Sequence, residues 1–152
     1  MEFGARSLGN RSILANPRDP KMKDRLNYVV KQREGFRPFA PTITEEEYQK
    51  FFEASEPSPY MSRVMKTRTK FIPSATHVDG TCRVQTVSQK QNRKFHKLIT
   101  LIGNQSSIPV VLNTSFNLKD ETITLTPKQA IERYLKSEID FLVIDNFLVK
   151  KR

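Results

Sequence analysis

The chain has 152 residues, the length of one ordinary domain, and 37% of them are hydrophobic. Its single cysteine excludes an intrachain disulfide, and no apolar run approaches the roughly 20 residues of a membrane-spanning helix or begins the chain as a secretory signal would, so we expect a cytoplasmic protein without membrane contact. The formal net charge of +10 points to an anionic partner, whether nucleotide, small phosphate or nucleic acid.

Helix and strand signals alternate from the start of the chain. Asp19 and Pro20 are typical of a helix N-terminus and predict a helix over residues 20–31. Its buried face would carry Met22, Leu26, Val29 and Val30. Residues 39–43 follow as a short buried strand, and a capping box of Thr44 and Glu47 predicts a second, short helix before Phe52.

The middle of the chain predicts two further strands, over residues 60–65 and 82–88, separated by a loop at 67–80. Alternating polar and apolar residues at 82–88 would place Arg83 on a polar face. The apolar spacing at positions 95, 98, 99, 101 and 102 predicts an amphipathic helix over 91–103 that contributes this stripe to the core.

The last third predicts a central strand, a helix and two closing strands. The apolar run from Pro109 would end in Asn113, Thr114 and Ser115, at the kind of strand end where α/β folds bind ligands. Thr126 and Pro127 predict a helix start, and the buried stripe of this helix would be Ala130, Ile131, Tyr134 and Leu135. Strands at 140–145 and 147–149 complete a single α/β domain over residues 1–152.

Four clusters combine basic residues with small hydroxyl or amide residues beside glycine or proline. They are Arg6-Ser-Leu-Gly-Asn-Arg11, Lys31-Gln-Arg33-Glu-Gly-Phe-Arg37-Pro, His77-Val-Asp-Gly-Thr-Cys-Arg83 and Leu112-Asn-Thr-Ser-Phe-Asn117. Guanidinium groups match phosphate oxygens in a two-point geometry, and lysine adds a compact charge. Residues 1–37 contain nine Lys/Arg against four Asp/Glu, and residues 62–97 nine against one, so convergence of these segments would create an anion-binding site.

In this order, the four clusters closely resemble motifs of the C-terminal domain of the O-carbamoyltransferases that modify nodulation factors and antibiotics. The resemblance also includes Met22-Lys-Asp-Arg-Leu-Asn27 and extends from Glu2 to about Lys150. It implies a YrdC-like α/β fold, with a twisted mixed sheet flanked by helices. It further implies an enzyme that reacts carbamoyl phosphate with ATP to form carbamoyl adenylate and pyrophosphate.

The resemblance also implies which side chains form the site. Carbamoyl and phosphate groups would be held by Arg6, Arg37, Arg83 and Ser115, which are the expected catalytic residues. Lys31 and its neighbour Arg33 would face the nucleotide phosphates. Apart from the resemblance, Arg11, His77 and Asn113 are further candidates for nucleotide binding, and His77 could instead order its loop. Magnesium would accompany ATP through the phosphates, so we expect no metal site built by the protein itself.

Three positions depart from the family pattern, and one large part of the family's proteins has no counterpart. Ala5 stands where proline is usual, and Ser7 and Cys82 stand where alanine is usual. Family members carry a long N-terminal kinase-like domain, with histidine metal ligands, that completes transfer to the acceptor. We therefore expect that this chain is a fragment or a split-gene product, and that its partner is such a domain or subunit.

Other functions compete with this interpretation. A metal site or a Cys–His nucleophile built from His77, Cys82 and His96 matches no familiar spacing, and His96 beside Lys97 suits a solvated position. The charge of +10 also permits a basic RNA- or nucleotide-binding module, although the basic residues are not interleaved with closely spaced aromatics. A subunit that binds ligand without turnover is a third alternative.

Overall fold

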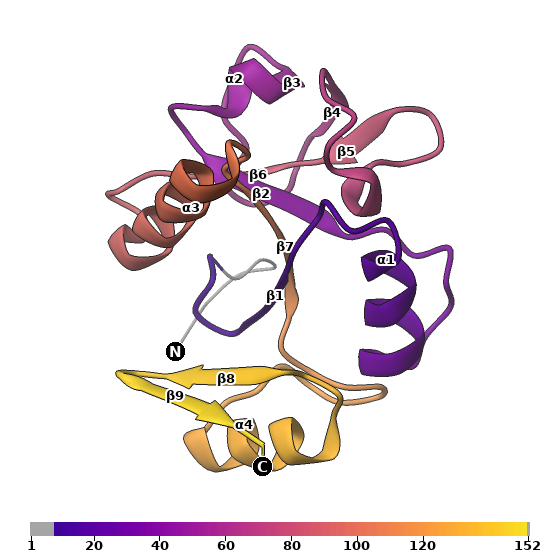
Figure 1. Cartoon of the computed structure of the whole chain (residues 1–152), viewed down its shortest axis with the longest axis vertical. Coiled ribbons are helices and arrows are strands. Elements are labelled where there is room, and N and C mark those ends of the chain that lie inside the picture. Colours follow the sequence, from indigo (N-terminus) through magenta and orange to yellow (C-terminus); the bar gives the residue numbers. More distant parts are fainter. Residues whose placement is uncertain (1–7, 152) are drawn as a thin grey trace.

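The computed structural model describes residues 8–151, which form a mixed α/β fold around a four-stranded sheet. The strand order is β1 (Ser12–Ala15), β7 (Val110–Ser115), β2 (Ala40–Thr44) and β6 (Gln85–Val87). β7 is antiparallel to both of its neighbours, whereas β2 and β6 are parallel. The prediction of an α/β fold with a mixed sheet is therefore confirmed (Figure 1).

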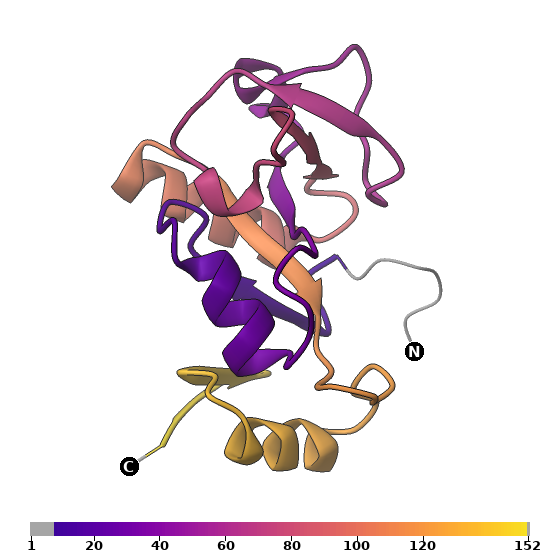
Figure 2. The ribbon, with the colours of Figure 1, turned by 90° about the vertical axis from the view of Figure 1, so that its right-hand side faces the viewer.

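Two smaller antiparallel sheets lie at opposite ends of the molecule. The first consists of β3 (Phe52–Glu53), β4 (Val64–Thr67) and β5 (Thr81–Arg83). The second is the hairpin of β8 (Phe141–Ile144) and β9 (Phe147–Lys150), beside helix α4 (Pro127–Lys136). Figures 1 and 2 show the central sheet between these two ends.

Helices pack on both faces of the central sheet. Helix α3 (Arg93–Ser106) contributes Phe95 and Ile99 to a cluster with Val87 and Val111. The opposite face carries the larger cluster, in which residues of the first helical segment pack with Leu112. Successive residues of β7 therefore enter different clusters, which explains why an unbroken apolar run forms this central strand.

The predicted helix over 20–31 is present, but most of it is a π-helix. A short α1 (Met22–Asp24) continues as η1 (Arg25–Val30), and Asp19 precedes it, with Oδ1 accepting from Lys21 N at 2.9 Å. Leu26 and Val30 are buried as predicted, whereas Val29 is 44% exposed, contrary to prediction. The wider turn directs Asn27 and Lys31 inward instead, at 0% and 4% exposure.

The segments on either side of the β4 strand differ from the prediction in two ways. The capping box of Thr44 and Glu47 does not form, and the short α2 (Tyr48–Phe51) is followed by Phe52 in a strand. The single strand expected over 82–88 is two strands, because the chain leaves one sheet at Arg83 and enters the other at Gln85. This transition brings β5 and the central sheet together beside Arg83.

The helix stripes are narrower than predicted. On α3, Leu98 and Leu101 are 42% and 50% exposed, because only the 95/99/102 edge of the helix meets the sheet. His96, expected in solvent, is 8% exposed, and its Nε2 lies 2.8 Å from Glu46 Oε2. On α4, Ala130 and Tyr134 are buried, whereas Ile131 and Leu135 are exposed. None of the helices within residues 8–151 is long and apolar enough to cross a lipid bilayer.

Candidate anion-binding site

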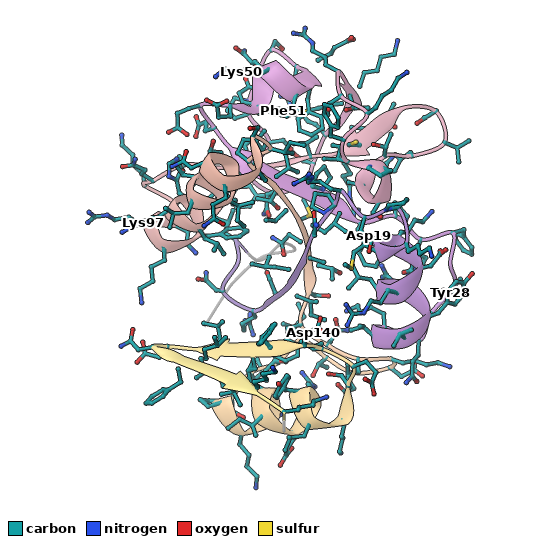
Figure 3. All side chains as sticks on the ribbon, viewed as in Figure 1. Asp19, Tyr28, Lys50, Phe51, Lys97 and Asp140 are labelled. Carbon is teal, nitrogen blue, oxygen red and sulfur yellow. The ribbon has the colours of Figure 1, made fainter. Side chains whose placement is uncertain are left out.

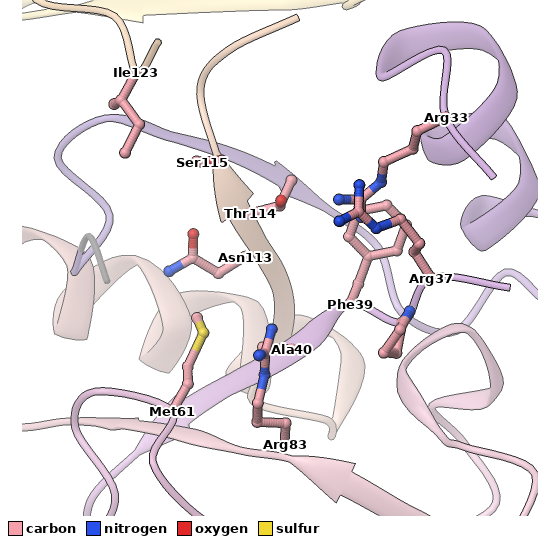
Figure 4. A pocket seen from close by; sticks show the side chains of 11 residues that line it. Arg33, Arg37, Phe39, Ala40, Met61, Arg83, Asn113, Thr114, Ser115 and Ile123 are labelled. Carbon is pink, nitrogen blue, oxygen red and sulfur yellow. The ribbon is translucent and has the colours of Figure 1, made fainter. Parts of the chain in front are cut away.

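Three arginines from two distant parts of the sequence line one cavity of about 330 Å³. Arg33 and Arg37 come from the segment after η1, and Arg83 comes from the end of β5. The end of β7 supplies Asn113, Thr114 and Ser115, and the remaining lining residues are Pro38, Phe39, Ala40, Met61 and Ile123. Figure 4 shows the guanidinium groups of Arg33 and Arg37 near each other by the ring of Phe39, with Arg83 rising from the opposite wall.

Arg33 is held in place on three sides. Its Nε donates to Asn27 Oδ1 at 2.8 Å, its backbone N donates to Asn27 O at 2.8 Å, and its guanidinium carbon lies 4.7 Å from the centre of the Phe39 ring. Stacking on an aromatic face stabilises a guanidinium group without using its terminal NH₂ groups. The terminal nitrogens of Arg33 thus remain directed at the cavity (Figure 4).

A buried polar network supports the floor of the cavity, where β6, β2 and β7 lie side by side. Gln85, which is 0% exposed, accepts from Thr42 Oγ1 at 2.9 Å and from Asn113 Nδ2 at 2.6 Å. Gln85 Nε2 donates to Pro59 O at 2.9 Å, which fixes the orientation of the amide. Hydrogen bonds between buried polar groups rigidify a site, because leaving any of these groups without a partner would cost free energy.

Lys31 connects η1 to the end of β7. Its Nζ donates to Ser115 O and Asn117 O at 2.8 Å each and to Asn117 Oδ1 at 2.6 Å. Ser115 Oγ donates to the same Asn117 Oδ1 at 2.6 Å, so Lys31 and Ser115 share one acceptor. The three donors of the ammonium group are matched by three protein oxygens, which places Lys31 behind the cavity wall.

Positive charge is concentrated at this site, because Arg33, Arg37 and Arg83 line one cavity. Burial, together with the charges of Arg33, Arg133 and Arg37, lowers the pKa of Lys31 to about 8. Burial likewise lowers the pKa of Arg33 below its usual value, and the neighbouring charge of Arg37 adds to this effect. Among the described residues that line the cavity there is no carboxylate, and Glu34 reaches Arg37 only at 3.8 Å on the exposed side.

The structure brings together five of the residues singled out in the sequence: Arg33, Arg37, Arg83, Asn113 and Ser115. Arg11 lies in a different, larger cavity of about 640 Å³, where its Nη1 donates to Thr124 O at 3.1 Å. His77 lies in the loop before β5, with Nδ1 2.9 Å from Thr81 Oγ1, and does not line the arginine cavity. Arg6 lies outside the described residues, as do Ala5 and Ser7.

No group of three potential metal ligands drawn from His, Cys, Asp and Glu occurs within the part of the chain that the structure describes. Cys82 is fully buried, and burial raises the pKa of its thiol to about 11, so it is a thiol at neutral pH. His96 is on α3, bonded to Glu46. His96 is therefore on a different element from His77 and Cys82, which lie at the turn into β5.

Sequence reasoning assigned no role to Asn27 and Gln85, the two fully buried amides that hold the cavity walls. Asn27 was visible as the last residue of the motif Met22-Lys-Asp-Arg-Leu-Asn27, but the apolar spacing assigns the buried face to Met22, Leu26, Val29 and Val30 and leaves Asn27 outside it. Gln85 was visible as a polar residue in a strand, and the switch between sheets at Val84 explains why it is buried.

Comparison with known proteins decides the family. The family model described as carbamoyltransferase C-terminus matches residues 1–151. The chain belongs to this family. It is 46% identical over 157 residues to nodulation protein NolO of Bradyrhizobium diazoefficiens, covering 99% of this chain and 29% of that protein.

Two further relatives show how widely the carbamoyltransferase C-terminal family extends. The chain is 43% identical over 155 residues to an uncharacterized protein, MJ1058, of Methanocaldococcus jannaschii, covering 100% of this chain and 26% of that protein. It is 40% identical over 121 residues to a 3'-hydroxymethylcephem-O-carbamoyltransferase of Amycolatopsis lactamdurans, covering 79% of this chain and 23% of that enzyme. The chain thus spans less than a third of the length of these relatives.

Proposed function

We propose that the arginine cavity binds carbamoyl phosphate together with the phosphates of ATP, and that the chain catalyses formation of carbamoyl adenylate. The observation that carries the proposal is the meeting of Arg33, Arg37 and Arg83 around one hollow with no carboxylate among its described lining residues. Such a concentration of like charge is unfavourable until an anion enters. A volume of about 330 Å³ suits the small reacting groups, with the nucleoside extending beyond them.

The proposed chemistry needs two anions to approach each other. Water cleaves carbamoyl phosphate to carbamate and inorganic phosphate, and a carbamate oxygen then forms a bond to the α-phosphorus of ATP. The bond from this phosphorus to the bridging oxygen breaks, and pyrophosphate leaves. The arginines offset repulsion between the reactants and stabilise the charge on the phosphorus oxygens and on pyrophosphate. Magnesium would be held by the phosphates.

The family supports the carbamoyl part of this proposal, since one relative is by name an O-carbamoyltransferase. We further propose that the fold is YrdC-like and that the second half of the transfer, to a hydroxyl acceptor, requires an additional kinase-like domain or subunit. The greater length of the relatives supports this division. A cytoplasmic location would supply both ATP and reduced thiol conditions for Cys82.

The decisive experiment is exchange of labelled pyrophosphate into ATP by the purified chain with magnesium. We expect exchange that depends on carbamoyl phosphate and that Arg83→Ala abolishes. Lys50→Ala is the matched control, because it removes one positive charge from α2, where Lys50 is exposed (Figure 3) and does not line the cavity. Absence of exchange, with no shift of the melting temperature by either ligand, would refute the proposal.

The alternatives are separate outcomes of the same measurements. Melting-temperature shifts by carbamoyl phosphate and ATP without exchange would support a ligand-binding subunit that needs its partner for turnover. Tight, salt-dependent binding of RNA without binding of carbamoyl phosphate would support the nucleic-acid module.

A further inference from the structure

The side chain of Asn27 contacts both ends of the arginine-bearing segment 33–37. Its Oδ1 accepts from Arg33 Nε at 2.8 Å, and its Nδ2 donates to Arg37 O at 2.9 Å and to Gly35 O at 3.3 Å. Its backbone O also accepts from Arg33 N at 2.8 Å. All of these bonds are made by a residue with no exposed surface, so the segment is tied to η1 through one buried amide.

The shape of the segment depends on the same stretch of helix. Gly35 lies against the hydroxyl of Tyr28, the residue after Asn27, so a Cβ at this position would displace the exposed Tyr28 side chain. Gln32, immediately before the segment, has a φ of 47°, in the left-handed region that ends many helices. The sharp return after η1 thus brings residues 33–37 back against Asn27.

The amide geometry determines which atoms of Arg33 are available. Because Nε is bonded to Asn27 and the guanidinium plane lies against Phe39, only the terminal nitrogens are left to reach into the cavity. The bond from Nδ2 to Arg37 O holds the backbone of Arg37 at the same wall. The guanidinium group of Arg33 and the backbone of Arg37 are thereby held at one wall before any ligand binds, which reduces the cost of ordering them.

We propose that Asn27 is a positioning residue that sets Arg33 and Arg37 as one preorganised unit for a phosphate or pyrophosphate group. This rests on the proposed function, but it concerns a residue that never contacts the ligand. An amide is required, because aspartate would accept from Arg33 but could not donate to the carbonyls of Gly35 and Arg37. Aspartate would also neutralise the charge of Arg33.

The test is isothermal titration of inorganic pyrophosphate, without metal, into the wild-type chain and into Asn27→Ala and Asn27→Asp. We expect about 10-fold or greater loss of affinity in both variants, the range for a bond to a charged group. The matched control is Asn92→Ala, which removes the N-cap of α3, where the side chain accepts from Phe95 N at 3.0 Å. This control should lower the melting temperature yet leave pyrophosphate affinity within about 2-fold.

A positioning role predicts a second result that general destabilisation of the fold does not predict. In an Arg33→Ala background, Asn27→Ala should cost much less affinity than in the wild type, because part of its effect acts through Arg33. Equal losses in both backgrounds would overturn the inference. Failure of the wild-type chain to bind pyrophosphate would instead overturn the proposed function, while wild-type binding with unchanged affinity in Asn27→Ala would overturn the positioning role alone.

A measurement on the unsubstituted protein keeps the inference falsifiable if the Asn27 variants do not fold. The Nε proton of Arg33 should exchange with solvent slowly in the ligand-free wild type, since it is bonded to a fully buried oxygen. The Nε proton of exposed Arg18 is the internal reference. Exchange at Arg33 as fast as at Arg18 would contradict the proposed tether.

Discussion

Positive charge has different roles in two regions of the molecule. One is the junction where Lys31 contacts the end of β7, and the other is the arginine cavity. At the junction, Lys31 is 4% exposed and donates to three protein oxygens. In the cavity, the side chain of Arg37 is 53% exposed, and its nearest carboxylate is 3.8 Å away at Glu34. Both residues belong to one sequence cluster, only six positions apart. The difference teaches that one basic cluster can combine a structural cation, Lys31, with cations that line a cavity and that we propose bind the ligand.

The largest expected effect is that of Lys31→Met, which should lower the free energy of unfolding. Ser115 O and both oxygens of Asn117, all partly buried, would lose the donor that Lys31 supplies, and we expect a loss of about 2–4 kcal/mol in the free energy of unfolding. Urea denaturation measures this loss. Lys50→Met, at an exposed lysine, should change the same quantity by no more than about 0.5 kcal/mol. Similar values for the two variants would show that Lys31 is not a structural cation.

Arg37→Ala should affect ligand binding rather than the stability of the fold, which is the reverse of the effect expected for Lys31→Met. Affinity for carbamoyl phosphate should fall about 10- to 30-fold, because a charged donor to the anion is lost. Stability should be unchanged or slightly higher, since the substitution removes one of several like charges. Calorimetric titration and urea denaturation on the same samples would test both halves. A large loss of stability in Arg37→Ala would remove the distinction between the two regions.

The lowered pKa of Lys31 predicts that the contribution of this residue to stability depends on pH. Burial lowers this pKa from 10.5 to about 8, so above pH 8 the folded chain releases a proton that the unfolded chain keeps. Stability due to Lys31 therefore rises with pH through this window. Relative to Lys31→Met, the wild type should gain roughly 1 kcal/mol between pH 7 and pH 9. A difference between the two proteins that is constant or shrinks with pH would contradict the buried cation.

The smallest expected effect is that of Glu34→Gln. The pair with Arg37 is long and exposed, so the free energy of unfolding should change by less than about 0.5 kcal/mol. Affinity for carbamoyl phosphate should rise slightly, by no more than about 3-fold, because one competing negative charge near Arg37 is gone. A marked loss of affinity would show that Glu34 orients Arg37.

The sequence predicted the order and type of most elements, and it singled out Arg37, Arg83 and Ser115, which the fold brings to one cavity. The inward turn of Lys31 could not be predicted, because it follows from the π-helical register of η1, which neither propensity nor periodicity specifies. The same register hides Asn27. The break between β5 and β6 was also hidden, since one alternating pattern runs through two sheets.

Surface exposure differed from the predictions for a related reason. Apolar stripes on α3 and α4 were read as fully buried, yet each helix packs along one edge only, leaving Leu98 and Leu135 exposed. Periodicity predicts which face of a helix turns inward, but the width of the contact depends on the partner element. The central sheet covers only part of α3, and the β8–β9 hairpin covers only part of α4.

The most direct test of the central claim is a titration of carbamoyl phosphate followed by calorimetry in the wild type, Arg33→Ala, Arg37→Ala, Arg83→Ala and Lys50→Ala. Saturable binding by the wild type and Lys50→Ala, with at least about 10-fold weaker binding by each cavity variant, is the predicted result. Equal weakening by Lys50→Ala would mean that only net charge matters. Undiminished binding by all three cavity variants would show that the three arginines do not form the anion site.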